Sequence, residues 1–441
     1  MSERMIASAP IGGNRISQGR SSLPYWIDIG WTSVGAASAA ITSIGLMPVM
    51  TRLFQPAEVA LHYLFLQLAS ALVVLQTARI EHFILVPKAD KEAMALVNLC
   101  SMLGLTVGFV ALPVFWLGST QITQWFDMPE FGRFVWLLPL YSLMLGTTFA
   151  LESMLQRKGA YSRAGLGEVA HRSSYAVIVI SGGVLAAGAP GLVMASMASL
   201  LIKSIYLSVN LRRVISIAGN SLQDLRRGLY SYGGRALNLV AAHLMQLVSV
   251  LVPLLFIAQH YGADQLGYFS LVSATMSVPT GLLGVSVGKV YYQRVAAMIA
   301  RGEVVDDLWA YTLKRLVIIA LPVFGLLAIF SGWLYPFVFG APWAPAGEVA
   351  MLMSPAFFAG FISVPLDRNA VLANKKIYLL CWNGGRLVGA VAVIGLARYN
   401  DWPFTLYILS VSATSTVIYL IDLTASKRFL RYLKTNQISV T

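Results

Sequence analysis

The chain is dominated by apolar stretches of about 20 residues, each long enough to cross a bilayer as a helix. Of the 441 residues, 57% are hydrophobic and only 12% are charged. Soluble domains do not have this composition, so the sequence predicts an all-α polytopic membrane protein. Twelve spans are expected, over residues 28–50, 59–79, 93–117, 131–154, 164–188, 191–211, 234–257, 266–287, 311–333, 347–366, 377–397 and 403–422.

Basic residues are distributed unevenly between the loops. With a cytoplasmic N-terminus, only Arg52, Arg133 and Arg398 of the 32 Lys and Arg residues fall outside, while Arg172 and Arg386 lie within spans. All the others are assigned to the inner side. Cytoplasmic loops carry the excess of Lys and Arg in membrane proteins, so both termini are predicted to be cytoplasmic. The net charge of +13 then reflects topology and does not indicate nucleic-acid binding.

The longest inner loop divides the spans six and six. We expect a disordered cytoplasmic tail over residues 1–25, an N-terminal six-helix bundle over 26–211, a cytoplasmic linker over 212–233, a C-terminal six-helix bundle over 234–424 and a cytoplasmic tail over 425–441. The linker contains Arg226, Arg227 and the pair Gly233-Gly234, which predict a membrane-surface segment and a turn.

The two halves begin with similar sequences. Aligning Pro48 with Pro253 also pairs Leu61 with Leu266, Tyr63 with Tyr268, Leu66 with Leu271, Ala69 with Ala274, and Ser70 with Thr275. Because both halves start on the inner side, this similarity indicates a parallel repeat. Transporters built from repeats bind their substrate near the midplane, between the halves.

Arg386 is the deepest charge in the sequence. It lies near the middle of the span 377–397, about 15 Å from either end of a helix. A charge at this depth costs about 2.5–3.5 kcal/mol on insertion scales, and no Asp or Glu lies at the centre of any span. A water-filled cavity or an anionic ligand is therefore expected, and a phosphate or diphosphate suits the guanidinium. A hydrogen bond to backbone or to an Asn or Gln on a neighbouring helix is the structural alternative.

Arg172 is a weaker candidate for the same role. It lies deep in the span 164–188, but Glu168 stands four residues earlier on the same helix face. Local pairing and snorkelling to the inner surface therefore compete with anion binding.

The seventh span has a polar stripe. Arg235, Asn238, Gln246 and Ser249 fall within about 60° of one direction on a helical wheel, which predicts a face turned to the interior or to a cavity. His243 lies about 80° from Arg235 and is either a proton-coupling residue or a packing residue.

Motifs for enzymatic chemistry are missing. Gly284, Gly288 and Lys289 suggest a phosphate-binding loop, but Leu283 and Val290 stand where it needs Gly and Ser or Thr. No zinc motif or nucleophile elbow is present, and the outer loops are short. The sequence therefore predicts no enzyme, no metal site and no ATP site.

Tryptophan residues gather near the expected span ends, among them Trp116, Trp333, Trp343 and Trp402. This placement predicts an interfacial aromatic belt, with stacking on sugar rings as the alternative.

Three stretches, residues 46–93, 252–284 and 339–376, resemble the oligosaccharide-flippase family of lipopolysaccharide biosynthesis proteins (Wzx-type). Residues that match the family pattern in the first stretch are Pro48, Arg52, Glu58, Arg79, Leu85, Pro87, Glu92 and Ala93. One departure is the Gly expected after Glu58, which is replaced around Leu61 and His62, although Gly267 occupies the equivalent position in the second half.

The resemblance implies a V-shaped transporter of two six-helix bundles, in the superfamily that also holds multidrug extruders and lipid II flippases. Its members move an undecaprenyl-diphosphate-linked oligosaccharide from the cytoplasmic to the periplasmic leaflet of a bacterial inner membrane, for O-antigen, exopolysaccharide or capsule synthesis. Ion-coupled alternating access is implied, as an H⁺ or Na⁺ antiporter without other cofactors. Polysaccharide polymerase and chain-length proteins are the implied partners.

With such a substrate, Arg386, Arg172, Arg235 and Arg79 would contact the diphosphate. Asn238 and Gln246 would contact sugar or line the path, and His243 would couple protons. A multidrug extruder of the same fold is the main alternative, although a cation exporter would usually need a mid-membrane carboxylate. A sugar-transferring membrane enzyme and a scaffold for polysaccharide assembly are further alternatives.

Overall fold

The computed structural model describes residues 42, 44–126, 128–212, 221–301, 303, 305–367, 369 and 376–438, and their regular structure is helical. After the helical residues Ile44–Leu53, the long helices of the first half are α2 (Pro56–Thr77), α3 (Asp90–Leu117), α5 (Leu138–Arg157), α6 (Tyr161–Val184) and α7 (Gly188–Arg212). The remaining long helices are α8 (Leu222–Tyr261), α9 (Ala263–Pro279), α10 (Val285–Ala300), α11 (Asp306–Phe339), α12 (Ala344–Ser363), α14 (Lys376–Tyr399) and α15 (Phe404–Ile438). Short elements connect them: η1 (Ile80–Phe83), α4 (Ser119–Phe126), η2 (Pro129–Arg133), η3 (Val135–Leu137), η4 (Thr280–Gly284) and η5 (Ala341–Trp343).

Eleven of the twelve predicted spans coincide with these helices, and the all-helical fold is confirmed for the described residues. Most of the first span lies outside the described residues. Nine of the described helical segments are long and apolar enough to cross a membrane. The segments α6 and α14, which carry Arg172 and Arg386, are not among those nine. The orientation of the termini stays a prediction.

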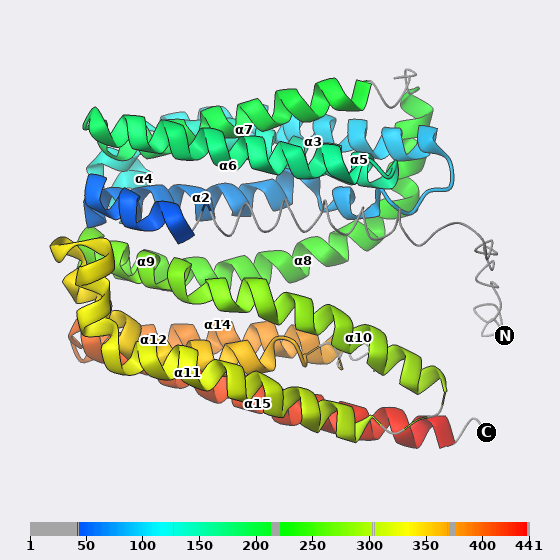
Figure 1. Cartoon of the computed structure of the whole chain (residues 1–441). Coiled ribbons are helices and arrows are strands. Elements are labelled where there is room, and N and C mark those ends of the chain that lie inside the picture. The colour runs from blue at the N-terminus through cyan, green and yellow to red at the C-terminus, as the bar shows by residue number, and fades with distance from the viewer. Residues whose placement is uncertain are drawn as a thin grey trace.

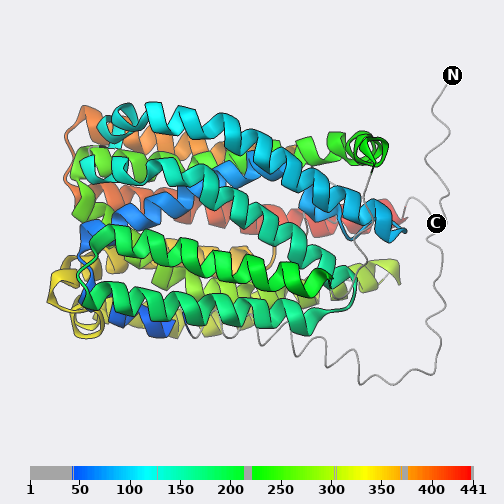
Figure 2. The ribbon, with the colours of Figure 1, turned by 90° about the horizontal axis from the view of Figure 1, so that it is seen from above.

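The helices form two halves that meet along α2, α8 and α9 (Figures 1 and 2). The halves converge at the end where α4 and the α11–α12 connection lie. They diverge toward the other end, where α10 runs away from the first half (Figure 1). We call this second end the basic end, because it carries Arg157, Arg212, Arg301, Lys427 and Arg428. The two halves thus form a V whose arms open at the basic end.

Helix α8 joins the halves and is bent. Its first part crosses the basic end nearly perpendicular to the bundle, and the rest runs between the halves (Figures 1 and 2). A turn was expected at Gly233-Gly234, but both residues lie inside α8, so this expectation was wrong. A glycine pair allows a helix to bend without ending, and part of the expected linker over residues 212–233 is therefore helical.

The first part of α8 is fixed to the N-terminal half. The Asp224 carboxylate forms an ion pair with Lys91 Nζ at 3.0 Å and accepts a hydrogen bond from the backbone N–H of Ser221, which caps the helix. Bonds from Lys91 and Ser221 lower the pKa of Asp224 to about 2. The ring of Tyr232 packs on Phe83 with 5.6 Å between centroids.

Trp343 joins the halves at the end opposite the basic end. It is fully buried, and its indole Nε1 donates a hydrogen bond of 2.8 Å to the carbonyl oxygen of Thr51. The ring of Tyr268 meets it edge-on, with 6.1 Å between centroids. Trp116 and Trp333 are exposed, as an aromatic belt requires, but Trp343 was wrongly assigned to that belt. An indole donor can be buried only where it reaches an acceptor.

The sequence repeat has a structural counterpart. Helices α2 and α9, which carry the aligned pairs from Leu61 and Leu266 onward, pack against each other. The hydroxyl of Ser70 donates to the carbonyl of Leu66 at 2.8 Å, and the aligned hydroxyl of Thr275 donates to the carbonyl of Leu271 at 2.9 Å. Equivalent residues therefore make equivalent bonds in the two halves.

Gly267 allows a very close approach between the halves. A Cβ atom at this position would lie 2.2 Å from the carbonyl oxygen of Pro56, far inside any real contact. The aligned residue of the first half is His62, whose buried ring instead forms a hydrogen bond of 2.7 Å with Ser196 inside its own half. The glycine is thus required in the second half, where α9 touches the start of α2.

We predict that Gly267→Ala separates α9 from α2 and lowers the melting temperature of the purified protein in detergent. The overpacking should cost about 1–3 kcal/mol, because the obstructing atom belongs to backbone. Gly325→Ala is the matched control, since a Cβ atom at Gly325 meets open space. Equal melting temperatures for the two variants would contradict the prediction.

Candidate functional site

A cavity of about 360 Å³ lies in the C-terminal half. Helices α8, α9, α12, α14 and α15 line it, and Tyr63 of α2 is the contribution of the N-terminal half. The cavity thus touches both halves but belongs mainly to one of them.

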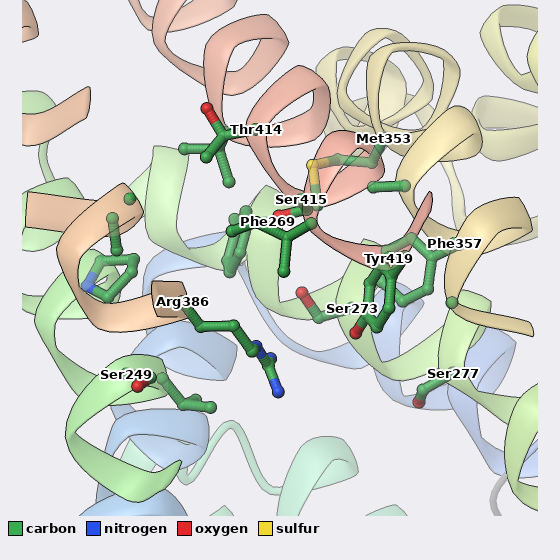
Figure 3. A pocket seen from close by; sticks show the side chains of 18 of the residues that line it. Ser249, Phe269, Ser273, Ser277, Met353, Phe357, Arg386, Thr414, Ser415 and Tyr419 are labelled. Carbon is green, nitrogen blue, oxygen red and sulfur yellow. The ribbon is translucent and has the colours of Figure 1, made fainter. Parts of the chain in front are cut away.

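Arg386 of α14 lies in the wall of this cavity, and its guanidinium points into it (Figure 3). The guanidinium carbon stands 5.9 Å from the ring centroid of Tyr419 on α15. In the described part of the chain, no carboxylate forms an ion pair with Arg386. The cation is therefore held by an aromatic face and remains available to a ligand.

Small residues bring α14 close to α15 beside the arginine. A Cβ atom at Gly389 would lie 3.0 Å from the Thr414 methyl group and 3.3 Å from Ile418. This close packing places Arg386 over Tyr419 and fixes the cavity wall from which it extends.

The cavity wall combines hydroxyl groups with apolar side chains. Hydroxyl groups come from Tyr63, Ser249, Ser273, Ser277, Thr280, Thr414, Ser415 and Tyr419. Apolar groups include Phe269, Met353 and Phe357 (Figure 3). Among the described lining residues none is Asp or Glu. One cation, many hydroxyls and an apolar lining suit an amphiphile with an anionic, oxygen-rich head.

Sequence reasoning found Arg386 and Ser249 but missed most of the hydroxyl groups. The signal for those of α15 is the Ser/Thr-rich run over residues 410–416. Only the packing of α9 and α15 beside α14 shows that these hydroxyls face the same cavity.

A second charged group lies buried in the N-terminal half. The Lys203 ammonium on α7 stands 2.7 Å from a carboxylate oxygen of Glu152 and 2.7 Å from one of Glu168. The Lys203 side chain is only 8% exposed. We expected Lys203 among the basic residues of the inner side, but it is part of a buried ion-pair network that links α5, α6 and α7.

Arg172 belongs to this network. Its Nε lies 2.7 Å from Glu168, the local pairing that the four-residue spacing suggested. Two carboxylates and two cations balance one another here. The structure therefore does not bring Arg172 into the cavity with Arg386.

Arg79 and His243 lie near the junction of the first half with α8. The Arg79 guanidinium pairs with Glu81 at 3.2 Å, and its backbone is left-handed with φ of 58°. His243 Nδ1 donates to the Leu239 carbonyl at 2.8 Å, and its ring stacks on His82 with 6.1 Å between centroids. Burial lowers the pKa of His82, which favours a neutral ring in this stack.

The other residues of the polar stripe follow α8 but do not line the cavity. Arg235 and Gln246 are exposed, and the side chain of Asn238 lies outside the described residues. Of the candidate site residues named from the sequence, the cavity contains only Arg386, accompanied by Ser249 of the stripe.

The fold and the cavity define a multi-pass helical membrane protein with a ligand-sized cavity in its C-terminal half. An inward-facing multidrug resistance MATE family transporter of the MOP superfamily is 14% identical over 94% of this chain and 96% of that chain, with a TM-score of 0.63. The lipid II flippase MurJ, in an inward closed conformation, is 12% identical over 92% and 90%, with a TM-score of 0.67. A MOP superfamily transporter from Pyrococcus furiosus is 16% identical over 94% and 95%, with a TM-score of 0.51. These likenesses concern the fold alone.

A family model for polysaccharide biosynthesis proteins matches residues 49–348. The chain therefore belongs to this family of polysaccharide biosynthesis proteins. No curated protein matches the chain.

We predict that Lys203→Met strongly destabilises the protein, because it leaves two carboxylates in the N-terminal half without their shared cation. Breaking a buried ion pair costs about 3–5 kcal/mol. Thermal unfolding in detergent measures the loss, and adding Glu152→Gln should restore part of it. Arg172→Gln is the control: it leaves Glu168 paired with Lys203 and should cost much less. Equal losses for Lys203→Met and Arg172→Gln would contradict this account.

Proposed function

We propose that the protein is a flippase for an undecaprenyl-diphosphate-linked oligosaccharide. It would move this lipid from the cytoplasmic to the periplasmic leaflet of a bacterial inner membrane, for O-antigen, exopolysaccharide or capsule synthesis. Membership of a polysaccharide biosynthesis family supports the pathway. A fold shared with a lipid II flippase supports the reaction type.

The observation that carries this proposal is Arg386 in a cavity whose described lining holds no acid. A diphosphate leaving water for a low-dielectric interior must have its charge compensated. A guanidinium can donate two parallel bonds to phosphate oxygens, and the surrounding hydroxyl groups can donate further bonds. Apolar side chains beside them suit the prenyl chain, while hydroxyls suit the sugar.

Alternating access between the two halves is the proposed mechanism. In this conformation the halves are joined at the Trp343 end and diverge at the basic end (Figure 1). The positive-inside rule predicts that the basic end is cytoplasmic, so the substrate would enter there. Its release would require the Trp343–Thr51 and Gly267–Pro56 contacts to open. H⁺ or Na⁺ coupling, and polymerase and chain-length partners, belong to the same proposal.

The remaining candidate residues take secondary roles in this proposal. Arg235 and Gln246 are exposed on α8 and could meet the substrate on its way to the cavity. Arg172 and Arg79 already have carboxylate partners, so an anion would have to compete for them. Asn238 and His243 remain predictions, as path-lining and proton-coupling residues respectively.

A multidrug exporter is the second candidate, because solved structures with this fold include multidrug resistance transporters. The cavity argues against cationic drugs, since Arg386 would repel them and no described lining residue offers a carboxylate. Drug-susceptibility assays separate the two functions: deletion of the gene should alter surface polysaccharide and leave resistance to cationic drugs unchanged.

We predict that Arg386→Ala lowers export of the lipid-linked sugar at least about tenfold, because hydrogen bonds to charged groups contribute about 1.5–3 kcal/mol each. Surface polysaccharide in a deletion strain carrying the variant measures this loss, and immunoblots of membranes check the protein level. Arg386→Lys should recover only part of the export, since an ammonium lacks the paired donors.

Arg398→Ala is the matched control for this experiment. Arg398 lies on α14, the same helix as Arg386, but is exposed near the C-terminal end of this helix, away from the cavity. Normal polysaccharide with Arg386→Ala at a normal protein level would refute the assignment. A loss with Arg398→Ala as large as with Arg386→Ala would show that the effect is not specific to the cavity.

A further inference from the structure

The C-terminal half buries a carboxylate that has no cationic partner among the described residues. Asp422 of α15 is 3% exposed. Its carboxylate accepts a hydrogen bond of 2.6 Å from the Ser363 hydroxyl of α12 and one of 2.7 Å from the Tyr378 hydroxyl of α14. Both donors are neutral, and in the described part of the chain no ion pair reaches Asp422. A buried carboxylate held in this way is ready to take up a proton.

The buried acids of the N-terminal half are held differently. Glu152 and Glu168 share the Lys203 ammonium, and Glu168 also has Arg172. Their negative charges are compensated by fixed cations, which favour the ionised form. The two halves therefore differ within the described residues: Glu152 and Glu168 of the first half have partners of opposite charge, whereas the partners of Asp422 are two hydroxyl groups.

Among the described side chains, the other charged groups around Asp422 form no ion pair with it. On the helix α15 itself, Lys427 lies over the ring of Trp309 of α11, 5.3 Å from its centroid. Asp367, which follows α12, is a second acid and acts electrostatically on the Tyr378 hydroxyl. On α14, Lys376 precedes Tyr378 by two residues, and its side chain lies outside the described part of the structure; the next cation along this helix is Arg386, two turns beyond Tyr378.

A series of side-chain contacts between α14 and α15 connects Asp422 to the cavity. Along α14, Tyr378, Trp382 and Arg386 follow at intervals of four residues and share one face. Tyr378 contacts Asp422, while Trp382 and Arg386 both lie 5.9 Å from the ring of Tyr419, three residues before Asp422. Tyr419 lines the cavity. The Asp422 carboxylate thus lies one helical turn along α15 from Tyr419 in the cavity wall.

We propose that Asp422 is a reversible proton-binding site coupled to the anion site at Arg386. In the binding step a hydronium ion transfers its proton to a carboxylate oxygen of Asp422, giving the neutral acid and water. No other bond changes. The half-exposed position of Tyr378 toward the basic end offers a route for water to reach the carboxylate.

The sign of the coupling follows from charge. Ionised Asp422 repels an anion approaching Arg386, and protonation removes this repulsion, so anion and proton favour each other's binding. Such positive coupling means that the proton and the anion bind together, whereas in an antiporter the two ligands must compete. The coupling rests on the proposed anion transport; the proton site itself does not.

Infrared difference spectroscopy of the full-length protein in proteoliposomes tests the proton site. Titration between about pH 5 and pH 9 should reveal the C=O band of a carboxylic acid, which Asp422→Asn should abolish. The amide oxygen of Asn can still accept the bonds from Ser363 and Tyr378, so this variant should fold. Asp307→Asn, at an exposed acid on α11, should leave the band unchanged.

A second variant tests the geometry of the site. Tyr378→Phe removes a hydrogen bond that stabilises the ionised form, so the midpoint of the titration should move upward by about 1 pH unit. A wild-type spectrum without a titrating band, a band that survives Asp422→Asn, or an unchanged midpoint in Tyr378→Phe would each overturn the proposal.

Farnesyl diphosphate, a short polyprenyl diphosphate, tests the coupling. Its addition should move the midpoint of the Asp422 band upward in the wild type and leave it unchanged in Arg386→Ala. If the band titrates but does not respond to the ligand, the coupling and the anion site fail while the proton site stands. If the band is absent but farnesyl diphosphate still competes with the lipid-linked substrate, the proton site fails and the transport function stands.

Discussion

The cost of burying charge in a low-dielectric interior determines how this protein is built. Its chain is apolar enough that each deep charge needs a partner, a hydrogen-bonded niche or a cavity. The N-terminal half solves this with fixed ion pairs around Lys203. The C-terminal half leaves Arg386 facing a cavity and Asp422 among hydroxyl groups. In the part of the chain that the structure describes, ion pairs compensate the buried charges around Lys203, whereas Arg386 and Asp422 have no ion-pair partner.

The two halves are joined in a way that suits the proposed alternating access. The tight contact between Gly267 and Pro56 and the buried Trp343–Thr51 bond both lie at the end opposite the basic residues. Helix α8 connects this end with the basic end, since its first part packs on the N-terminal half and its later part contributes Ser249 to the cavity. A relative movement of the halves would therefore change the cavity and the closed end together.

Much of the fold could be read from the sequence because membrane helices obey local rules. Apolar length placed eleven spans correctly, and the four-residue spacing of Glu168 and Arg172 correctly suggested their pairing. Lys203 was misplaced, because its partner Glu152 lies 51 residues earlier and no local pattern joins them. Trp343 was misread for the same reason: its acceptor at Thr51 is 292 residues away.

The sequence by itself determined that the chain is a helical membrane protein with a deep cation at Arg386, since hydropathy and charge act residue by residue. Only the tertiary structure decided which polar groups meet. It showed that Arg386 faces hydroxyls and an aromatic ring, that Lys203 is shared by Glu152 and Glu168, and that Asp422 lies one helical turn from the cavity wall. Such groups come from helices distant in sequence, and their meeting depends on how α12, α14 and α15 pack, which no single span encodes.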